Sequence, residues 1–285
     1  MRPVPGPGRG PRALAAVVAA VVLASALLTG CGRPAGPVAP GAGPGEEAAH
    51  GVRSAKGPTH TAQLYRHWGL SAPLPAPPSP PARRLRLPGG TPLPVVHRVP
   101  TRDRVVFLTY DDGAEKDPRF VDMVRELRLP VSMFLTDSVA GPGYGHFARL
   151  RSVGASIQNH TLDHAALRGL PYTGQRAEIC GQQNKLRARF GIRPRLFRPP
   201  YGTYDSTTLR AAADCGITAV VLWRAAMEGD GGLTYAHGPG RLRAGDIVSV
   251  PSGEPTGLSL RERTTRLLRE IQGRGLTVGR LEDYV

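Results

Sequence analysis

Two short stretches of the sequence carry side chains whose types and spacing suit a divalent metal ion. Asp111 and Asp112 stand side by side before Gly113, and His160 and His164 are four residues apart. Residues at that spacing face the same way across one helical turn. Two neutral imidazoles and one carboxylate form a three-ligand set that leaves positions open for water and substrate, as catalytic zinc requires. Asp112, His160 and His164 are therefore the candidate ligands.

Each stretch alone also has a plain structural interpretation. Asp-Gly is among the commonest turn dipeptides, so the two carboxylates fit an ordinary surface turn. A lone pair of histidines at this spacing is more often without a metal than with one. The metal interpretation therefore depends on both stretches meeting in the fold.

A third polar motif runs from Leu196 to Gly202. Pro199 and Pro200 fix the backbone there, so that the Arg198 side chain and the Tyr201 amide hold set directions. The simpler alternative is a rigid turn that carries a solvated arginine.

These motifs must be positioned by the regular elements that follow Pro100, where short β-branched runs alternate with helical patterns. The predicted strands are Val105–Thr109, Val131–Thr136, Ala155–Gln158, Arg195–Arg198, Ala219–Trp223, Asp246–Val250 and Leu276–Val278. The predicted helices are Pro118–Leu127, Gln175–Phe190, Ser206–Asp214 and Leu260–Gln272. Buried strands separated by helices indicate a parallel sheet, and about seven such units indicate an α/β fold that closes into a distorted (β/α) barrel. All three motifs then lie at the C-terminal ends of strands, where such barrels carry their chemistry.

In this order, each at a strand end, the three motifs resemble those of the polysaccharide deacetylase (NodB homology) family, over about Thr101 to Val285. The resemblance implies the NodB-like fold and hydrolysis of N- or O-linked acetyl groups on a cell-wall or extracellular polysaccharide. Peptidoglycan, chitin-like and xylan-like polymers are the candidate substrates.

The resemblance also implies a role for each motif. Asp111 would be the general base, while Asp112, His160 and His164 would bind the metal, with Zn²⁺ expected ahead of Co²⁺, Mn²⁺ or Ni²⁺. Arg198 would tune the base, and the Tyr201 amide would stabilise the oxyanion formed when water attacks the acetyl carbonyl.

The resemblance also implies that Trp223 and Pro200 line the substrate groove.

The sequence departs from the family pattern in two places. The family has an Asp shortly after the strand with the groove Trp, which orients the Arg, but Trp223 is followed by Arg224-Ala225-Ala226-Met227. The family also has a general-acid His after its last catalytic strand, and this chain has Pro251 there.

These departures leave two interpretations open. One is an enzyme weakened by loss of its acid, which would favour acetate esters because an alkoxide leaves more readily than an unprotonated amine. The other is a non-catalytic glycan-binding lipoprotein. Four residues are candidate substitute acids, although each also fits a solvated loop: Glu228, Asp230, His237 and Glu254.

The first thirty residues have the features of an export signal. Three arginines precede an apolar run from Ala13 to Leu28 that is too short to span a bilayer comfortably. The run closes on Leu28-Thr29-Gly30-Cys31, which resembles a bacterial lipobox. Residues 1–30 are thus expected to be a signal peptide, and Cys31 the lipidated first residue of a protein anchored to the outer side of the cell membrane. The alternatives are a plain cleavage site or an uncleaved anchor.

Residues 31–100 are expected to be a linker rich in Pro, Gly and Ala that favours polyproline II. Its exception is Thr61–Leu70, a short amphipathic stretch that either docks or forms a marginal helix.

The net charge of +15 falls mostly outside the predicted domain, which keeps only +6 of it. With no nucleic-acid motif in the sequence, a nucleic-acid partner is not expected.

Apart from Cys31, the cysteines are Cys180 and Cys215, which form either one disulfide or two buried thiols.

Overall fold

The computed structural model describes residues 64–82, 93–251 and 257–285, all within one compact unit, Ser54–Val285. The signal segment, Cys31 and Glu254 lie outside the described residues, so the expectations about them are carried forward as predictions.

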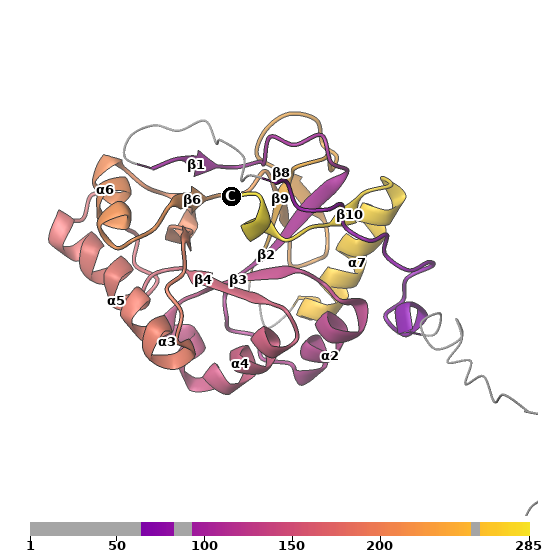
Figure 1. The fold of residues 1–285 in the computed structure, drawn as a ribbon, viewed down its shortest axis with the longest axis horizontal. Coiled ribbons are helices and arrows are strands. Elements are labelled where there is room, and N and C mark those ends of the chain that lie inside the picture. The colour runs from indigo at the N-terminus through magenta and orange to yellow at the C-terminus, as the bar shows by residue number, and fades with distance from the viewer. Residues whose placement is uncertain (1–63, 83–92, 252–256) are drawn as a thin grey trace, which may run out of the picture. The chain divides into compact units, whose positions relative to one another are not determined.

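The unit is built on one sheet, which comprises ten strands in the described part of the chain. Its path is β1-β6-β5-β4-β3-β2-β9-β7-β8, with β10 beside the start of β2, and only the β7–β8 pair is antiparallel. The strands are β1 Val95–Val96, β2 Val105–Asp112, β3 Val131–Leu135, β4 Ser156–Asn159, β5 Leu196–Phe197, β6 Ala219–Val221, β7 Ala225–Met227, β8 Leu233–Tyr235, β9 Ile247–Val250 and β10 Thr277–Val278. The sheet curls, and helices lie around its outside (Figure 1).

The helices begin and end where the sequence supplies caps. They are α2 Pro118–Leu127, α3 Asp137–Ala140, α4 Tyr144–Ser152, α5 Tyr172–Phe190, α6 Ser206–Asp214 and α7 Leu260–Gly273. Asp117 caps α2 ahead of Pro118, and both α6 and α7 start with a capping box, Asp205 with Thr208 and Ser259 with Glu262.

The predicted fold class is confirmed, and each of the seven predicted strands is present with shifted ends. The largest shift matters most: β2 continues through Asp112 instead of ending at Thr109, so both carboxylates belong to the strand itself. Four further features were not predicted from the sequence: β1, the β7–β8 hairpin, α3 and α4.

Part of the segment expected to be a linker packs on the barrel. Val95 and Val96 pair with β6, so the sheet begins before residue 101. Further upstream, Trp68 and Leu70 are buried, and Trp68 Nε1 donates to Glu126 Oε2 of α2 at 2.8 Å. The described part of the amphipathic stretch, residues 64–70, therefore docks on the barrel domain.

A disulfide joins Cys180 of α5 to Cys215, which follows α6. The two cysteines are thus paired and not free thiols. No helix among the described residues combines the length and apolar character needed to cross a bilayer.

Candidate metal centre and active site

The end of β2 presents Asp111 and Asp112 at the carboxyl edge of the sheet. Asp112 has a left-handed backbone (φ 64°), and Gly113 follows with φ 87°. A Cβ on Gly113 would lie 2.8 Å from the ring of Phe147, so a glycine is needed for the chain to leave the strand here.

The two histidines follow β4 on a loop. The expected helical turn is wrong: Thr161 and His164 both have positive φ, and the segment is not helical. The loop is tied instead by side chains, since Asn159 Oδ1 accepts from the Thr161 amide at 2.9 Å and Thr161 Oγ1 accepts from the His164 amide at 3.1 Å. Side-chain bonds that compete with helical ones thus bring both imidazoles to one point.

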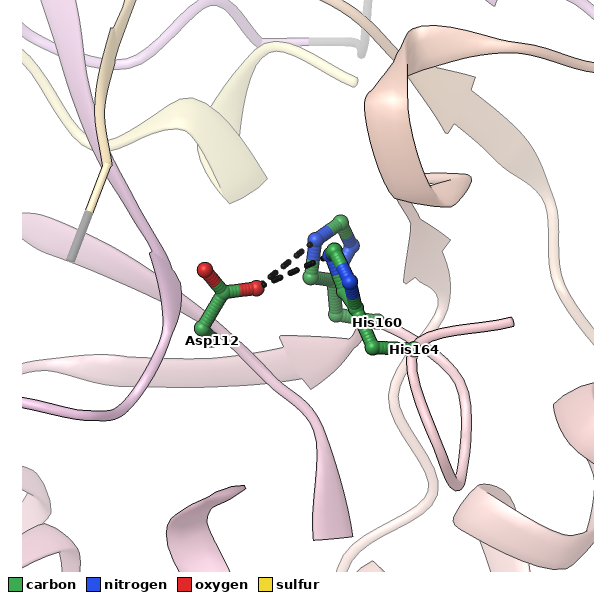
Figure 2. Close-up of side chains that lie close together, drawn as sticks. All are labelled: Asp112, His160 and His164. Atoms are coloured by element: carbon green, nitrogen blue, oxygen red, sulfur yellow. Dashed lines mark ion pairs between the residues drawn. The ribbon is translucent and has the colours of Figure 1, made fainter. Parts of the chain in front are cut away.

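Asp112, His160 and His164 converge as predicted (Figure 2). Asp112 Oδ1 lies 3.3 Å from His160 Nε2 and 3.1 Å from His164 Nε2, and the candidate ligand atoms are all within 4.8 Å of one another. His160 Nδ1 is 2.7 Å from the Arg198 carbonyl oxygen, which can only accept a hydrogen bond. The proton therefore sits on Nδ1, and Nε2 offers its lone pair to the centre.

This arrangement fits a cation. Asp112 Oδ1 is buried and accepts no well-aligned hydrogen bond, although two imidazole nitrogens surround it. A buried oxygen without a donor is costly, and a metal ion would satisfy it together with the imidazole nitrogens of His160 and His164.

The electrostatics of the three groups point the same way. Burial raises the pKa of Asp112, but the adjacent His160 and His164 outweigh it and hold that pKa well below its ordinary value. The neighbouring Asp112 carboxylate raises the pKa of His164, and burial partly opposes this. Asp112 is thus ionised, as a metal ligand must be.

Asp111 lies next to this centre, and both of its oxygens are held. Arg198 Nη1 donates to Oδ1 at 2.6 Å, and Ser249 Oγ donates to Oδ2 at 2.7 Å. The two hydrogen bonds therefore fix the orientation of the carboxylate, and the Arg198 guanidinium places a positive charge next to it.

Arg198 is fully buried and is held without the family's missing Asp. Its guanidinium donates to Thr109 Oγ1 at 2.9 Å and to two carbonyl oxygens of the Val221–Leu222 segment. It lies 4.4 Å from the ring centre of Phe134 and 5.3 Å from that of Trp223. The partner that balances its buried charge is Asp111 itself.

The turn after Arg198 forms one wall of the site. Tyr201 is 64% exposed, with its ring 4.8 Å from the His164 ring. A Cβ on Gly202 would lie 3.0 Å from Trp223, so the indole packs against this turn. Pro200 of the same turn is buried.

Backbone strain gathers at this point of the fold. Five non-glycine residues of the described chain have positive φ, and four of them belong to the site: Asp112, Thr161, His164 and Tyr201. Such strain is held in place by the surrounding structure and concentrates at functional sites.

The position of the absent general acid is structurally anchored. Pro251 is exposed, and its carbonyl accepts from Nη1 of the buried Arg263 at 2.6 Å. Among the described candidate substitutes, Glu228 accepts from Thr234 Oγ1, and Asp230 accepts from the Gly232 amide. His237 stacks edge-on with His97, its ring centre 5.8 Å away.

The sequence analysis missed Ser249, Thr109 and Phe134. A signal for Ser249 existed, because it is the one polar residue in the apolar run Ile247–Val250. In the observed register Thr109 pairs with Ser249, so both point to the same face of the sheet as Asp111.

Comparison with known proteins adds to this geometry. The sequence pattern of the polysaccharide deacetylase family matches residues 98–220. An uncharacterised protein of Streptomyces coelicolor is 67% identical over 192 residues, which cover 67% of this chain and 77% of that protein. A chitin deacetylase of Amylomyces rouxii is 35% identical over 118 residues, which cover 40% of this chain and only 27% of that enzyme.

Solved structures share the fold. A family 4 carbohydrate esterase from Bacillus anthracis superposes with a TM-score of 0.56 at 19% identity, covering 66% of this chain and 86% of that one. A family 4 pseudoenzyme, also from Bacillus anthracis, gives 0.56 at 16% identity, with 66% and 68% covered.

Proposed function

Because the sequence pattern of the polysaccharide deacetylase family matches residues 98–220 of this chain, we propose that it is a metal-dependent hydrolase that removes acetyl groups from an extracellular polysaccharide. The observation that carries the proposal is the convergence of Asp112, His160 and His164 beside the fixed carboxylate of Asp111. Two imidazoles and one carboxylate with an open side suit Zn²⁺.

Each residue of the site has a part in the proposed reaction. A bound zinc ion supplies Lewis acidity, which polarises an acetyl carbonyl and lowers the pKa of water. Asp111 takes the proton of the attacking water, and Arg198 and Ser249 keep its oxygens aimed. The Tyr201 amide, on the strained turn beside His164, is assigned to the developing oxyanion.

The substrate class follows from how the tetrahedral intermediate breaks down. An amide nitrogen must be protonated before it leaves, and Pro251 stands where the acid is expected. A sugar alkoxide departs with less help. We therefore propose that O-acetyl groups, as on acetylated xylan, are hydrolysed faster than N-acetyl groups, by a margin larger than intrinsic reactivity alone gives.

The decisive experiment measures acetate released from acetylated xylan, chitooligosaccharide and peptidoglycan after loading with zinc. Asp111→Asn should lower the rate by about 10²-fold or more while the metal stays bound, because Asp111 is assigned as base and not as ligand. Efficient acetate release from N-acetylglucosamine oligomers by the unmodified chain would overturn the ester preference and would mean that another group supplies the proton.

The missing acid also favours a second candidate function. A chain that holds the metal and binds glycan without hydrolysing it would act as a glycan-binding protein. Binding of chitooligosaccharide or xylan together with no acetate release from any of the three polymers, at full metal occupancy, would select this alternative.

A further inference from the structure

Five arginines line a pocket of the barrel that is separate from the metal centre. The pocket has a volume of about 440 Å³, and no acidic residue lines it. Its arginines are Arg102, Arg104, Arg241, Arg243 and Arg274.

This pocket lies at the opposite end of the strands from the metal centre. Arg104 immediately precedes β2, and Arg243 precedes β9. Arg274 lies just ahead of β10. Because these strands are parallel, their starts share one end of the barrel, while Asp112 and His160 lie at the other.

Four of the five pocket arginines have no ion pair with an acidic side chain among the described residues. Asp246 is engaged by the buried Arg224 and by Arg98. Glu270 pairs with Arg274, and Asp103 accepts from the Tyr284 hydroxyl.

The other arginine side chains of the pocket keep their charge available. Within the described part of the chain, Arg102 and Arg241 have no side-chain ion pair or hydrogen bond, and Arg243 Nε is buried without a partner. Arg104 is held in place by neutral groups, donating to the carbonyl oxygens of Gly275 at 2.9 Å and Arg274 at 2.7 Å. These contacts fix its guanidinium without neutralising it, which lowers the entropy lost when an anion binds.

We propose that this pocket binds the phosphate groups of a polyanionic polymer. Guanidinium groups pair with phosphate oxygens in a planar, two-pronged geometry, and several of them around one hollow match a tetrahedral anion. A second pocket, lined where β4 and β5 begin, carries four more arginines beside Glu282: Arg151, Arg193, Arg195 and Arg280. Two cationic pockets at one end suit a chain of repeated phosphates.

A membrane surface fits this end less well. Faces that lie on a bilayer add apolar and aromatic side chains to their basic ones. Among the described residues the exposed large apolar side chains are Leu170 and Tyr201, and neither lines the arginine pockets.

The test measures binding of the full chain to long-chain inorganic polyphosphate by titration calorimetry at two salt concentrations. Arg102→Glu together with Arg241→Glu should weaken binding by about tenfold or more, since charge-assisted hydrogen bonds are lost and like charges are introduced. The matched control, Arg176→Glu together with Arg187→Glu on exposed positions of α5, makes the same change in net charge and should bind as the parent does. Rising salt should weaken binding of the parent.

Three outcomes would overturn the proposal. Equal weakening by both double variants would mean that net charge alone attracts polyphosphate. Absence of binding by the parent would remove the site. Binding to vesicles of equimolar phosphatidylglycerol and phosphatidylcholine, with none to polyphosphate, would assign this end to a membrane. A circular dichroism melt of each variant checks that it is folded.

Discussion

At the scale of single residues, the site depends on acceptor atoms that face one another without a hydrogen between them. Asp112 Oδ1 and His160 Nε2 are 3.3 Å apart, while His160 Nδ1 donates a hydrogen bond to the Arg198 carbonyl oxygen. In a folded protein without a cation such a group would be repulsive and underbonded. Its persistence at a strained loop indicates that the fold is shaped for an ion.

The ligand assignment predicts metal content. The chain should bind about one equivalent of zinc, and His160→Ala with His164→Ala should reduce bound zinc to near zero, because a single carboxylate is too weak a site. Mass spectrometry of the dialysed protein measures this. His97→Ala with His237→Ala, the other close histidine pair, is the control and should keep full occupancy. Full zinc content in the first variant would show that the ligands are elsewhere.

Ser249 gives a separate prediction for the base. Its hydroxyl holds Asp111 Oδ2, so Ser249→Ala should lower kcat by about tenfold, the value of one hydrogen bond to a charged group. KM and zinc content should change little. Ser249→Thr keeps the hydroxyl and should restore most of the rate. If Ser249→Ala and Ser249→Thr lose activity equally, packing and not the hydrogen bond is responsible.

At the scale of elements, the periodic patterns in the sequence were sufficient to predict the main strands and helices of the barrel. They were insufficient to predict where β2 ends and that β7 forms. The apolar run of β2 was evident, but its continuation through two aspartates was not, because propensity disfavours carboxylates in strands. β7 has the sequence Ala-Ala-Met, which carries no β-branched signal, and it forms because β9 and β8 flank it. Tertiary pairing therefore decided what local pattern could not.

The site shows the same division. Residue types identified Asp112, His160 and His164 as candidate ligands, and the structure brings these three side chains together. The observed loop, by contrast, depends on the side-chain bonds of Asn159 and Thr161, which spacing does not reveal. The Arg198–Asp111 contact was expected from the family resemblance alone, because spacing along the chain does not show that the ends of β2 and β5 come together.

The capping box of α6 predicts a pH effect on stability. Hydrogen bonds from the Gly169 and Thr208 amides, which outweigh burial, lower the pKa of Asp205 from 3.8 to about 2. A lowered pKa in the folded state means that the ionised cap stabilises the fold above about pH 4 and that this contribution disappears as the pH falls towards 2. Asp205→Ala should cost about 1 kcal/mol at neutral pH, measured by urea denaturation.

Asp205→Asn is the matched control for that change. Asparagine caps helices as well as aspartate does, so the stability at neutral pH should stay near that of the parent. The variant has no carboxylate at the cap and should lose less stability than the parent between pH 4 and pH 2. Parallel acid curves for the parent and Asp205→Asn would mean that other carboxylates account for the acid sensitivity.

At the scale of the whole molecule, the two ends of the barrel differ in charge and in chemistry. One end holds the carboxylates and imidazoles of the metal centre, and the other carries the arginine pockets. A polymer bound at the end with the arginine pockets would leave the metal centre accessible to a different polymer chain. The described upstream residues 64–82 contact both α7 and β10. Arg269 Nε of α7 donates to the Gly69 carbonyl at 2.8 Å, and Thr277 Oγ1 of β10 donates to the Pro75 carbonyl at 2.5 Å. Gly69 and Pro75 are thus tied to the side of the barrel ahead of β1.

The N-terminal sequence predicts a lipid anchor on the outer side of the cell membrane. Leu28-Thr29-Gly30-Cys31 closes an apolar run after three arginines, so we expect Cys31 to carry the lipid that anchors the chain. Cys31→Ala should move the protein from the detergent phase to the aqueous phase, or leave it with its signal peptide uncleaved, as judged by partitioning and by mass. Cys180→Ser with Cys215→Ser removes the other two cysteines and should stay in the detergent phase, since the disulfide contributes to stability and not to anchoring. The anchor would have to lie elsewhere if Cys31→Ala kept both the partitioning and the mass of the parent.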